Sequence, residues 1–186
     1  MLKATPTKIP DCLIVESAVH QDERGHFTKW FQTDAFRALG LPTQWAEDYT
    51  SVSKNGVIRG LHFQTPPFEH DKLVICLQGR AFDVVLDVRL GSPTWGEHLA
   101  FDLSADKPCA VFIPAGCAHG FCALEDNTIL LYKVGSIHAP QHDSGIRWDS
   151  AEIVWPIKTP IVSKRDQALL ELSEFNTPFQ FRILRK

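Results

Sequence analysis

The chain has 186 residues, 44% of them hydrophobic and 22% charged, which suits one soluble domain with a single well-filled core. Its formal net charge of -3 gives no positive field for holding nucleic acid, and no apolar run approaches the roughly 18 residues of a membrane span. Neither nucleic acid nor a membrane is therefore an expected partner.

The cysteine pattern and the first residues point to the cytoplasm. Five cysteines, an odd number without a C-x-x-C pair, favour neither a disulfide framework nor a zinc ribbon. The first eleven residues also lack the apolar stretch of a signal peptide. We expect reduced, mostly buried thiols at Cys12, Cys76, Cys109, Cys117 and Cys122.

The first part of the chain predicts a hairpin and a helix. Residues 13–19 and 26–31 have strand composition, and the turn-prone run 21–25 lies between them. Residues 33–39 begin with a threonine, contain helix formers and are followed by Gly40, so they are expected to form a short helix.

Most of the remaining chain reads as short strands separated by turns rich in glycine, proline, aspartate and asparagine. Repeated strands about 8 to 12 residues apart, with almost no helical periodicity, predict an all-β jelly-roll sandwich or barrel. A loop-rich C-terminal part with a short helix near residues 166–174 is expected to complete it. The expected strands are residues 45–53, 56–63, 73–77, 81–90, 97–103, 110–113 and 128–136.

Two acids interrupt one of these apolar strands. Asp83 and Asp87 share a face of strand 81–90, so both point either to solvent or into a barrel lumen.

A cluster of chemically useful side chains lies in residues 56–72. Arg59 suits anions, His62 can exchange a proton near neutral pH, and Lys72 can stabilise developing negative charge. The alternative is a core histidine beside two solvated cations, and no motif here decides between them.

A second motif contains another histidine. The run I-P-A-G-C-A-H-G-F ending at Phe121 has the P-x-G-x-x-H shape with which cupin jelly rolls bring a histidine, here His119, into the barrel. A cupin metal site also needs an earlier H-x-H, where this chain reads H-F-Q from His62 to Gln64. We therefore expect no metal, and His119 is a candidate for an anion or hydroxyl contact or a structural histidine.

Taken together, these segments resemble the dTDP-4-dehydrorhamnose 3,5-epimerase family, metal-free cupins that invert centres beside a ketone in a nucleotide-linked sugar. The similarity runs in order through nearly the whole chain. It is carried by D-E-R-G at 22–25, residues 56–64, K-L-V at 72–74, S-P-T at 92–94, residues 113–121, Y-K at 132–133, G-I-R-W at 145–148, W-P at 155–156 and S-K-R-D at 163–166.

The resemblance implies catalytic roles that fit the residue types. Proton removal beside a ketone needs a base, a stabiliser for the enolate oxygen and an acid on the opposite ring face, but no redox cofactor. The resemblance implies that His62 is the base, Asp166 its orienting carboxylate, Tyr132 the acid and Lys72 the residue facing the C4 oxyanion. Tyr132 is one of only two tyrosines, and its alternative is a core phenol.

The resemblance also implies a substrate and an assembly. The substrate is a nucleotide-diphosphate sugar, usually on the way to a surface polysaccharide such as O-antigen, and the protein is a homodimer that exchanges N-terminal strands.

Arg59 and His62 have opposite strand parity, so a bulge or a strand end is needed to bring both to one pocket. The expected substrate-binding residues are Arg24, Phe27, Lys29, Glu47, Tyr49, Arg59, His119, His138, Asp143 and Arg165.

Several positions depart from the family's pattern. Lys29 replaces a glutamate, Glu47-Asp48-Tyr49 replaces Gln-Asp-Asn, His138 replaces a tyrosine, and Arg165 replaces a lysine. A carboxylate at position 47 can accept from the amino group of cytosine, so CDP competes with dTDP as the expected nucleotide. Loss of the phenol at position 138 favours inversion at C3 and leaves C5 open.

Three other functions compete with this interpretation. One is a metal-dependent cupin oxygenase or isomerase that uses His62, His119 and a carboxylate. The second is a sugar-binding jelly roll without turnover, and the third is a ketoisomerase that moves the carbonyl between C3 and C4. The missing H-x-H and the presence of Lys72 and Asp166 place the epimerase first.

Overall fold

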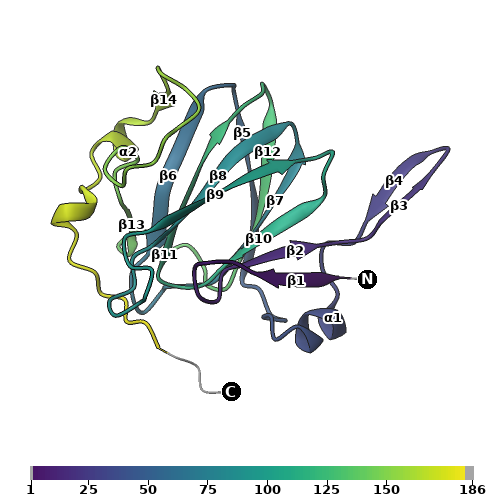
Figure 1. The fold of residues 1–186 in the computed structure, drawn as a ribbon, viewed down its shortest axis with the longest axis horizontal. Helices are drawn as coiled ribbons and strands as arrows, with labels where there is room; N and C mark the ends of the chain where they lie inside the picture. The colour runs from purple at the N-terminus through teal and green to yellow at the C-terminus, as the bar shows by residue number, and fades with distance from the viewer. Residues whose placement is uncertain (1, 183–186) are drawn as a thin grey trace.

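The computed structural model describes residues 2–182 and confirms the predicted jelly roll, because two antiparallel sheets pack face to face (Figure 1). The first sheet has the order β1 (Lys3–Pro6), β2 (Leu13–Glu16), β10 (Cys109–Ile113), β7 (Lys72–Gln78), β12 (Thr128–Val134) and β5 (Glu47–Ser53). The second has the order β13 (Asp143–Gly145), β6 (Val57–Gln64), β11 (Cys117–Ala123), β8 (Arg80–Asp87) and β9 (His98–Ser104), with β14 (Ile161–Val162) parallel to β6.

The remaining elements lie at the periphery. A hairpin of β3 (Val19–Asp22) and β4 (Gly25–Thr28) projects from the body of the molecule at the right of Figure 1. Helix α1 (Thr33–Ala38) buries Phe36 against the outer face of the first sheet, where Leu73 and Ile75 belong to the same cluster. Helix α2 (Lys164–Gln167) and the 3-10 helix η1 (Leu172–Glu174) lie beside the second sheet.

The space between the sheets is filled by side chains that alternate along each strand. On β12, Leu130, Tyr132 and Val134 are buried, whereas the intervening residues are half-buried. Facing them from the second sheet are Val85 and Phe121. Because strand side chains alternate with a period of two, this pattern fixes the register that sends Tyr132 inward.

The two acids of β8 point into the barrel and not to solvent. Asp83 and Asp87 are both fully buried. Asp83 binds His119, while Asp87 accepts hydrogen bonds from Arg89 at 2.8 and 2.9 Å. Burial is tolerated here because each carboxylate has a charged or polar partner.

The prediction of one C-terminal helix near residues 166–174 is wrong. Two short helical pieces stand there, because the backbone between them extends to pair with the chain near Ile146. Leu170 forms a parallel bridge with Ile146 and accepts a hydrogen bond from the Arg147 amide at 2.8 Å. These contacts outweigh the local helix propensity.

Other boundaries also differ from the sequence prediction. The strand expected at residues 13–19 is two strands, β2 and β3, with a break at Ser17, whose hydroxyl donates to the Lys29 carbonyl at 2.8 Å. Strands β1, β11, β13 and β14 were not predicted as strands. The predicted hairpin and the helix that follows it, α1, are otherwise confirmed.

A bulge in β6 resolves the opposite parity of Arg59 and His62. Opposite β11, His62 pairs with His119 and Arg59 pairs with Phe121, so β6 has one extra residue between these pairs. Gly60 occupies the bulge with φ +123, and an added Cβ would lie 2.6 Å from the Gly120 Cα. Only glycine fits this close approach, which turns both side chains to the same cavity.

All five cysteines are free, and four of them are buried. Within residues 2–182, no helix combines the length and the hydropathy needed to cross a membrane.

Candidate active site

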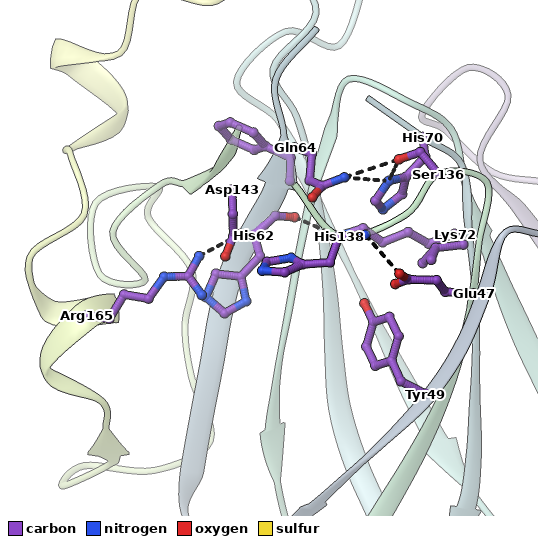
Figure 2. A pocket seen from close by; sticks show the side chains of 12 residues that line it. Glu47, Tyr49, His62, Gln64, His70, Lys72, Ser136, His138, Asp143 and Arg165 are labelled. Atoms are coloured by element: carbon purple, nitrogen blue, oxygen red, sulfur yellow. Dashed lines mark hydrogen bonds and ion pairs between the residues drawn. The ribbon is translucent and has the colours of Figure 1, made fainter. Parts of the chain in front are cut away.

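Two adjoining cavities lie between the sheets, and both are lined from β5 and β7 of the first sheet and from β6 of the second. The outer cavity, about 450 Å³, is drawn in Figure 2, and the inner cavity has about 220 Å³. Tyr49, His62 and Lys72 line both. The outer one is also lined by Glu47, Phe63, Gln64, His70, Val134, Ser136, His138, Asp143 and Arg165, and the inner one by Ser51, Arg59, His119, Phe121 and Tyr132.

His62 and Asp166 form a dyad at the boundary between the cavities. The His62 Nε2 lies 2.8 Å from the Asp166 Oδ1, and the second carboxylate oxygen accepts from the Gly60 amide at 3.1 Å. Burial opposes ionisation of Asp166, but the hydrogen bonds from His62 and Gly60 hold the pKa of this carboxyl below its ordinary value. An ionised carboxylate needs a proton on Nε2, so Nδ1 is the basic nitrogen.

The dyad depends on helix α2, although this helix has only four residues. The hydroxyl of Ser163, the N-cap residue, accepts from the Asp166 amide at 3.0 Å, which orients the first turn. Asp166 is the buried residue of this helix. A residue 104 positions away in sequence is thereby fixed beside His62.

Tyr132 lines the inner cavity from the first sheet, whereas His62 belongs to the second. Its ring stacks on Tyr49, with centroids 4.8 Å apart and planes 17° apart, and its hydroxyl lies 3.4 Å from the Ser51 Oγ. Burial raises the pKa of Tyr132 well above its ordinary value. The phenol is therefore protonated at neutral pH, on the wall facing the dyad.

Lys72 is a buried cation at the first position of β7. Its Nζ donates to the His62 carbonyl at 2.9 Å, and burial lowers its pKa to about 8. The nearby carboxylates of Asp143 and Asp83 partly oppose this shift. The ammonium is thus charged at neutral pH and retains two further N–H groups for a ligand.

His119 and Arg59 complete the inner cavity. The His119 Nε2 lies 2.6 Å from Asp83 Oδ2, and both side chains are buried. Arg59 donates to the Ser53 hydroxyl at 3.0 Å and to the Val52 carbonyl at 3.1 Å. These bonds orient the guanidinium along β5 and leave its other N–H groups available to an anion.

The rim of the outer cavity contains two polar pairs that are visible in Figure 2. The His138 amide donates to the Glu47 carboxylate at 3.0 Å, and Arg165 pairs with Asp143 at 2.7 Å. All four side chains were expected to bind substrate, and all four line this cavity.

Three expected binding residues lie outside both cavities of this chain. Arg24, Phe27 and Lys29 belong to the β3–β4 hairpin or directly follow it, and Figure 1 shows the hairpin projecting away from the barrel. Arg24 pairs with Asp22 and stays largely exposed, and Phe27 is 61% exposed. Within one chain the fold does not bring them to His62.

Sequence reasoning missed several lining residues. Gln64 donates to the Ser136 hydroxyl at 3.1 Å, and that hydroxyl lies 2.6 Å from the His70 Nδ1. Burial and the charge of Lys72 lower the pKa of His70 to about 4, so this imidazole is neutral. Gln64 shares the parity of His62, which is a signal that places it in the same cavity. His70 and Ser136 carry no such signal, because both lie outside regular strands.

A metal site is not formed by the side chains of residues 2–182, where no three histidine, cysteine or carboxylate groups cluster as ligands. His62 and His119 each direct Nε2 to a different carboxylate, that of Asp166 and that of Asp83. Such a donor set does not converge on one ion.

Comparison with known proteins finds one matching family. Residues 6–174 fit the family profile described as dTDP-4-dehydrorhamnose 3,5-epimerase. A protein of that name from Shigella flexneri is 41% identical over 163 residues, which cover 86% of this chain and 90% of that protein. A dTDP-4-dehydrorhamnose 3-epimerase from Streptomyces niveus is 40% identical over 156 residues, covering 82% and 75%.

The fold is shared with solved structures of the same group. The crystal structure of dTDP-4-dehydrorhamnose 3,5-epimerase from Bacillus anthracis, with TDP and PPi bound, superposes with a TM-score of 0.90 at 37% sequence identity. The alignment covers 92% of this chain and all of that one.

Proposed function

We propose that this chain, which belongs to the dTDP-4-dehydrorhamnose 3,5-epimerase family, inverts C3 of a nucleotide-linked 4-keto-6-deoxyhexose. The chain is an isomerase of the epimerase type that acts on nucleotide-linked sugars. One observation carries the proposal: the His62–Asp166 dyad and the Tyr132 phenol line one inner cavity from facing sheets.

The base acts first. Asp166 holds the proton on the His62 Nε2, so Nδ1 takes the hydrogen from the carbon next to the C4 ketone. The C–H electrons move to the C4 oxygen and form an enolate. The Asp166 carboxylate then stabilises the imidazolium, because its Oδ1 lies 2.8 Å from the His62 Nε2 and the pair is largely shielded from solvent.

The charge that develops on the C4 oxygen needs a donor that is already oriented. Lys72 supplies a desolvated ammonium whose position is fixed by its bond to the His62 carbonyl. Since this bond links the ammonium to the backbone of the base, the base and the oxyanion donor keep a constant separation.

Inversion then requires a proton from the other face. Tyr132 donates its phenolic proton to the carbon as the ketone re-forms. The phenolate then recovers a proton from solvent, and the His62 imidazolium releases its proton to solvent. The base and the acid come from opposite walls, so the proton leaves one ring face and returns on the other. No electron is gained or lost overall, so the reaction needs no redox cofactor.

Arg59, His119 and Arg165 are proposed to bind the diphosphate and the sugar hydroxyls. All three line the cavities, and a guanidinium suits the paired oxygens of a phosphate. Asp143 keeps Arg165 at the rim.

We propose a homodimer in which the partner subunit supplies the hairpin residues Arg24, Phe27 and Lys29. The hairpin projects from its own barrel and exposes Phe27, which fits a segment that docks on a second copy. Sedimentation equilibrium is expected to give twice the 20.9 kDa mass of the chain. A monomer that retains full activity would contradict the exchange.

The reaction is tested by incubating the protein in heavy water with 4-keto-6-deoxyhexoses linked to dTDP and to CDP. Deuterium at C3 with inversion is the expected NMR result. Exchange at C5 alone would contradict the C3 assignment, and a sugar-binding jelly roll without turnover would give no exchange at either carbon. The relatives are named both as 3,5-epimerases and as a 3-epimerase, so inversion at C5 is a separate question.

The nucleotide is proposed to be CDP because of Glu47. Its carboxylate is held at the rim by the His138 amide and lines the outer cavity, where it can accept from the amino group of cytosine. Thymine offers a carbonyl at that position, which a carboxylate repels.

We expect CDP to bind at least about tenfold more tightly than dTDP, since one charge-assisted hydrogen bond contributes roughly 1.5–3 kcal/mol. Glu47→Gln is expected to remove that preference in isothermal titration, because an amide can donate as well as accept. Tighter dTDP binding by the wild-type protein would contradict the proposal.

We further propose that the enzyme works in the cytoplasm, on a deoxysugar for a surface polysaccharide such as O-antigen or lipopolysaccharide. Five free cysteines, most of them buried, fit a reducing compartment.

A further inference from the structure

A second phenol stands beside the proposed acid. Tyr49 on β5 pairs directly with Tyr132 on β12, and the two rings stack 4.8 Å apart. Directly opposite residues of neighbouring antiparallel strands send their side chains to the same face, so both phenols point toward the second sheet and His62. Tyr49 lines both the outer and the inner cavity, whereas Tyr132 lines the inner one.

The two phenols differ in their surroundings. Tyr132 is 6% exposed and its hydroxyl neighbours Ser51, whereas Tyr49 is 44% exposed. Among the residues that the structure describes, the Tyr49 hydroxyl has no hydrogen-bond partner, and Figure 2 shows it directed into the cluster of cavity side chains. Packing within this chain therefore gives the hydroxyl no function, and it is free to contact a substrate.

The Tyr49 hydroxyl is protonated under working conditions. Burial, together with the negative charges of Glu47 and Asp143, raises its pKa to about 12. Positive side chains on the walls of these two cavities are Lys72, Arg59 and Arg165, and Arg165 is paired with Asp143. Tyr49 is thus a proton donor and not a phenolate at neutral pH.

We infer that Tyr49 is a second general acid, which returns the proton to C5 while Tyr132 serves C3. The inference rests on the proposed epimerase function. C3 and C5 flank the same ketone on opposite sides of the sugar ring, and two stacked phenols offer two donors side by side on one wall.

The step balances without a further reagent. His62 removes the C5 proton, the C–H electrons form the enolate at C4, and the Tyr49 O–H bond then breaks as the new C5–H bond forms. The ketone is restored, the His62 imidazolium releases its proton to solvent, and solvent returns a proton to the exposed phenolate. The same enolate stabiliser, Lys72, serves both carbons.

The test compares deuterium incorporation at C3 and C5 in heavy water, with the dTDP- and CDP-linked 4-keto-6-deoxyhexoses. The wild-type protein is expected to exchange and invert at both carbons. Tyr49→Phe keeps the stacked ring and is expected to lower the C5 rate at least about thirtyfold, within the range of general acid catalysis, with the C3 rate within about twofold. Tyr132→Phe is expected to lower the rate of inversion at C3 more than the rate at C5.

The matched control is Thr50→Val, which removes a hydroxyl from the next residue of β5, on the opposite face of the strand. It is expected to match the wild type at both carbons. Equal losses at C3 and C5 in Tyr49→Phe would assign the hydroxyl a general supporting role and overturn the inference, as would unchanged C5 exchange. A wild-type protein that exchanges C3 alone also overturns it while sparing the proposed function, and one that exchanges neither carbon overturns both.

Discussion

Replacing His62 with asparagine is expected to lower kcat for epimerisation by at least about a thousandfold, within the range that general base catalysis contributes. Asparagine can still donate a hydrogen bond to Asp166, so the bulge and helix α2 keep their contact. It has no basic nitrogen, so neither C3 nor C5 loses its proton. The measurement is kcat, with deuterium incorporation at both carbons followed by NMR.

Binding separates loss of chemistry from loss of structure in this variant. The Kd for the nucleotide is expected to stay within about threefold of the wild-type value, because in the proposed mechanism His62 acts on the sugar and not on the base. His98→Asn is the matched control, since His98 lies on β9 and lines neither cavity. A His62→Asn protein that retains a tenth of the wild-type exchange rate would rule out His62 as the base.

Replacing Lys72 with methionine is expected to lower kcat by about a hundredfold to a thousandfold, the usual effect of removing one oxyanion donor. Methionine fills a similar volume, so the buried site keeps its packing. Because burial lowers the Lys72 pKa to about 8, wild-type kcat is also expected to fall above that pH as the ammonium is lost. A pH profile of kcat that is flat from 7 to about 9.5 would contradict this role.

The same lysine predicts a pH dependence of stability with a defined sign. Its pKa is about 8 in the folded protein and 10.5 ordinarily, so the unfolded chain binds more protons between these values. The free energy of unfolding therefore gains up to about 3 kcal/mol from this group as pH rises from 8 to 10.5. Urea unfolding of wild type and Lys72→Met isolates the contribution, because other groups are common to both. A difference between them that does not change with pH would contradict the burial argument.

The fold class was predictable because its signals are local. Alternating apolar residues, turn dipeptides and short spacing identify strands one at a time, and an all-β sandwich is the simplest way to pair them. The C-terminal helix failed for the opposite reason: Leu170 pairs with Ile146, a contact between distant segments that sequence propensity does not register.

The site was predictable in part. Residue types and family resemblance together identified His62, Lys72 and Tyr132, and these line the inner cavity. The bulge at Gly60 was recognised only as a requirement, because one extra residue in a strand leaves no mark on periodicity. Strand β11 was missed since its glycine and small residues suit a turn as well as a strand buried on both faces.

The stacked tyrosine pair shows where sequence reasoning ends. Tyr49 and Tyr132 are 83 positions apart, and nothing local says that β5 and β12 are neighbours in this register. Pairing between distant strands is set by the whole sheet order, which one sequence does not specify. The same holds for Asp83. The sequence marked it as an acid on an apolar strand, but its bond to His119 depends on β8 lying next to β11.

A crystal structure with a bound nucleotide-linked 6-deoxyhexose is the most direct test of whether the base and the acid act from opposite faces of the sugar. The predicted result places the His62 Nδ1 next to the hydrogen of C3 on one face of the pyranose, with the Tyr132 hydroxyl directed at C3 from the other face. A ring bound with both side chains on one face, or a sugar seated outside the inner cavity, would contradict the mechanism.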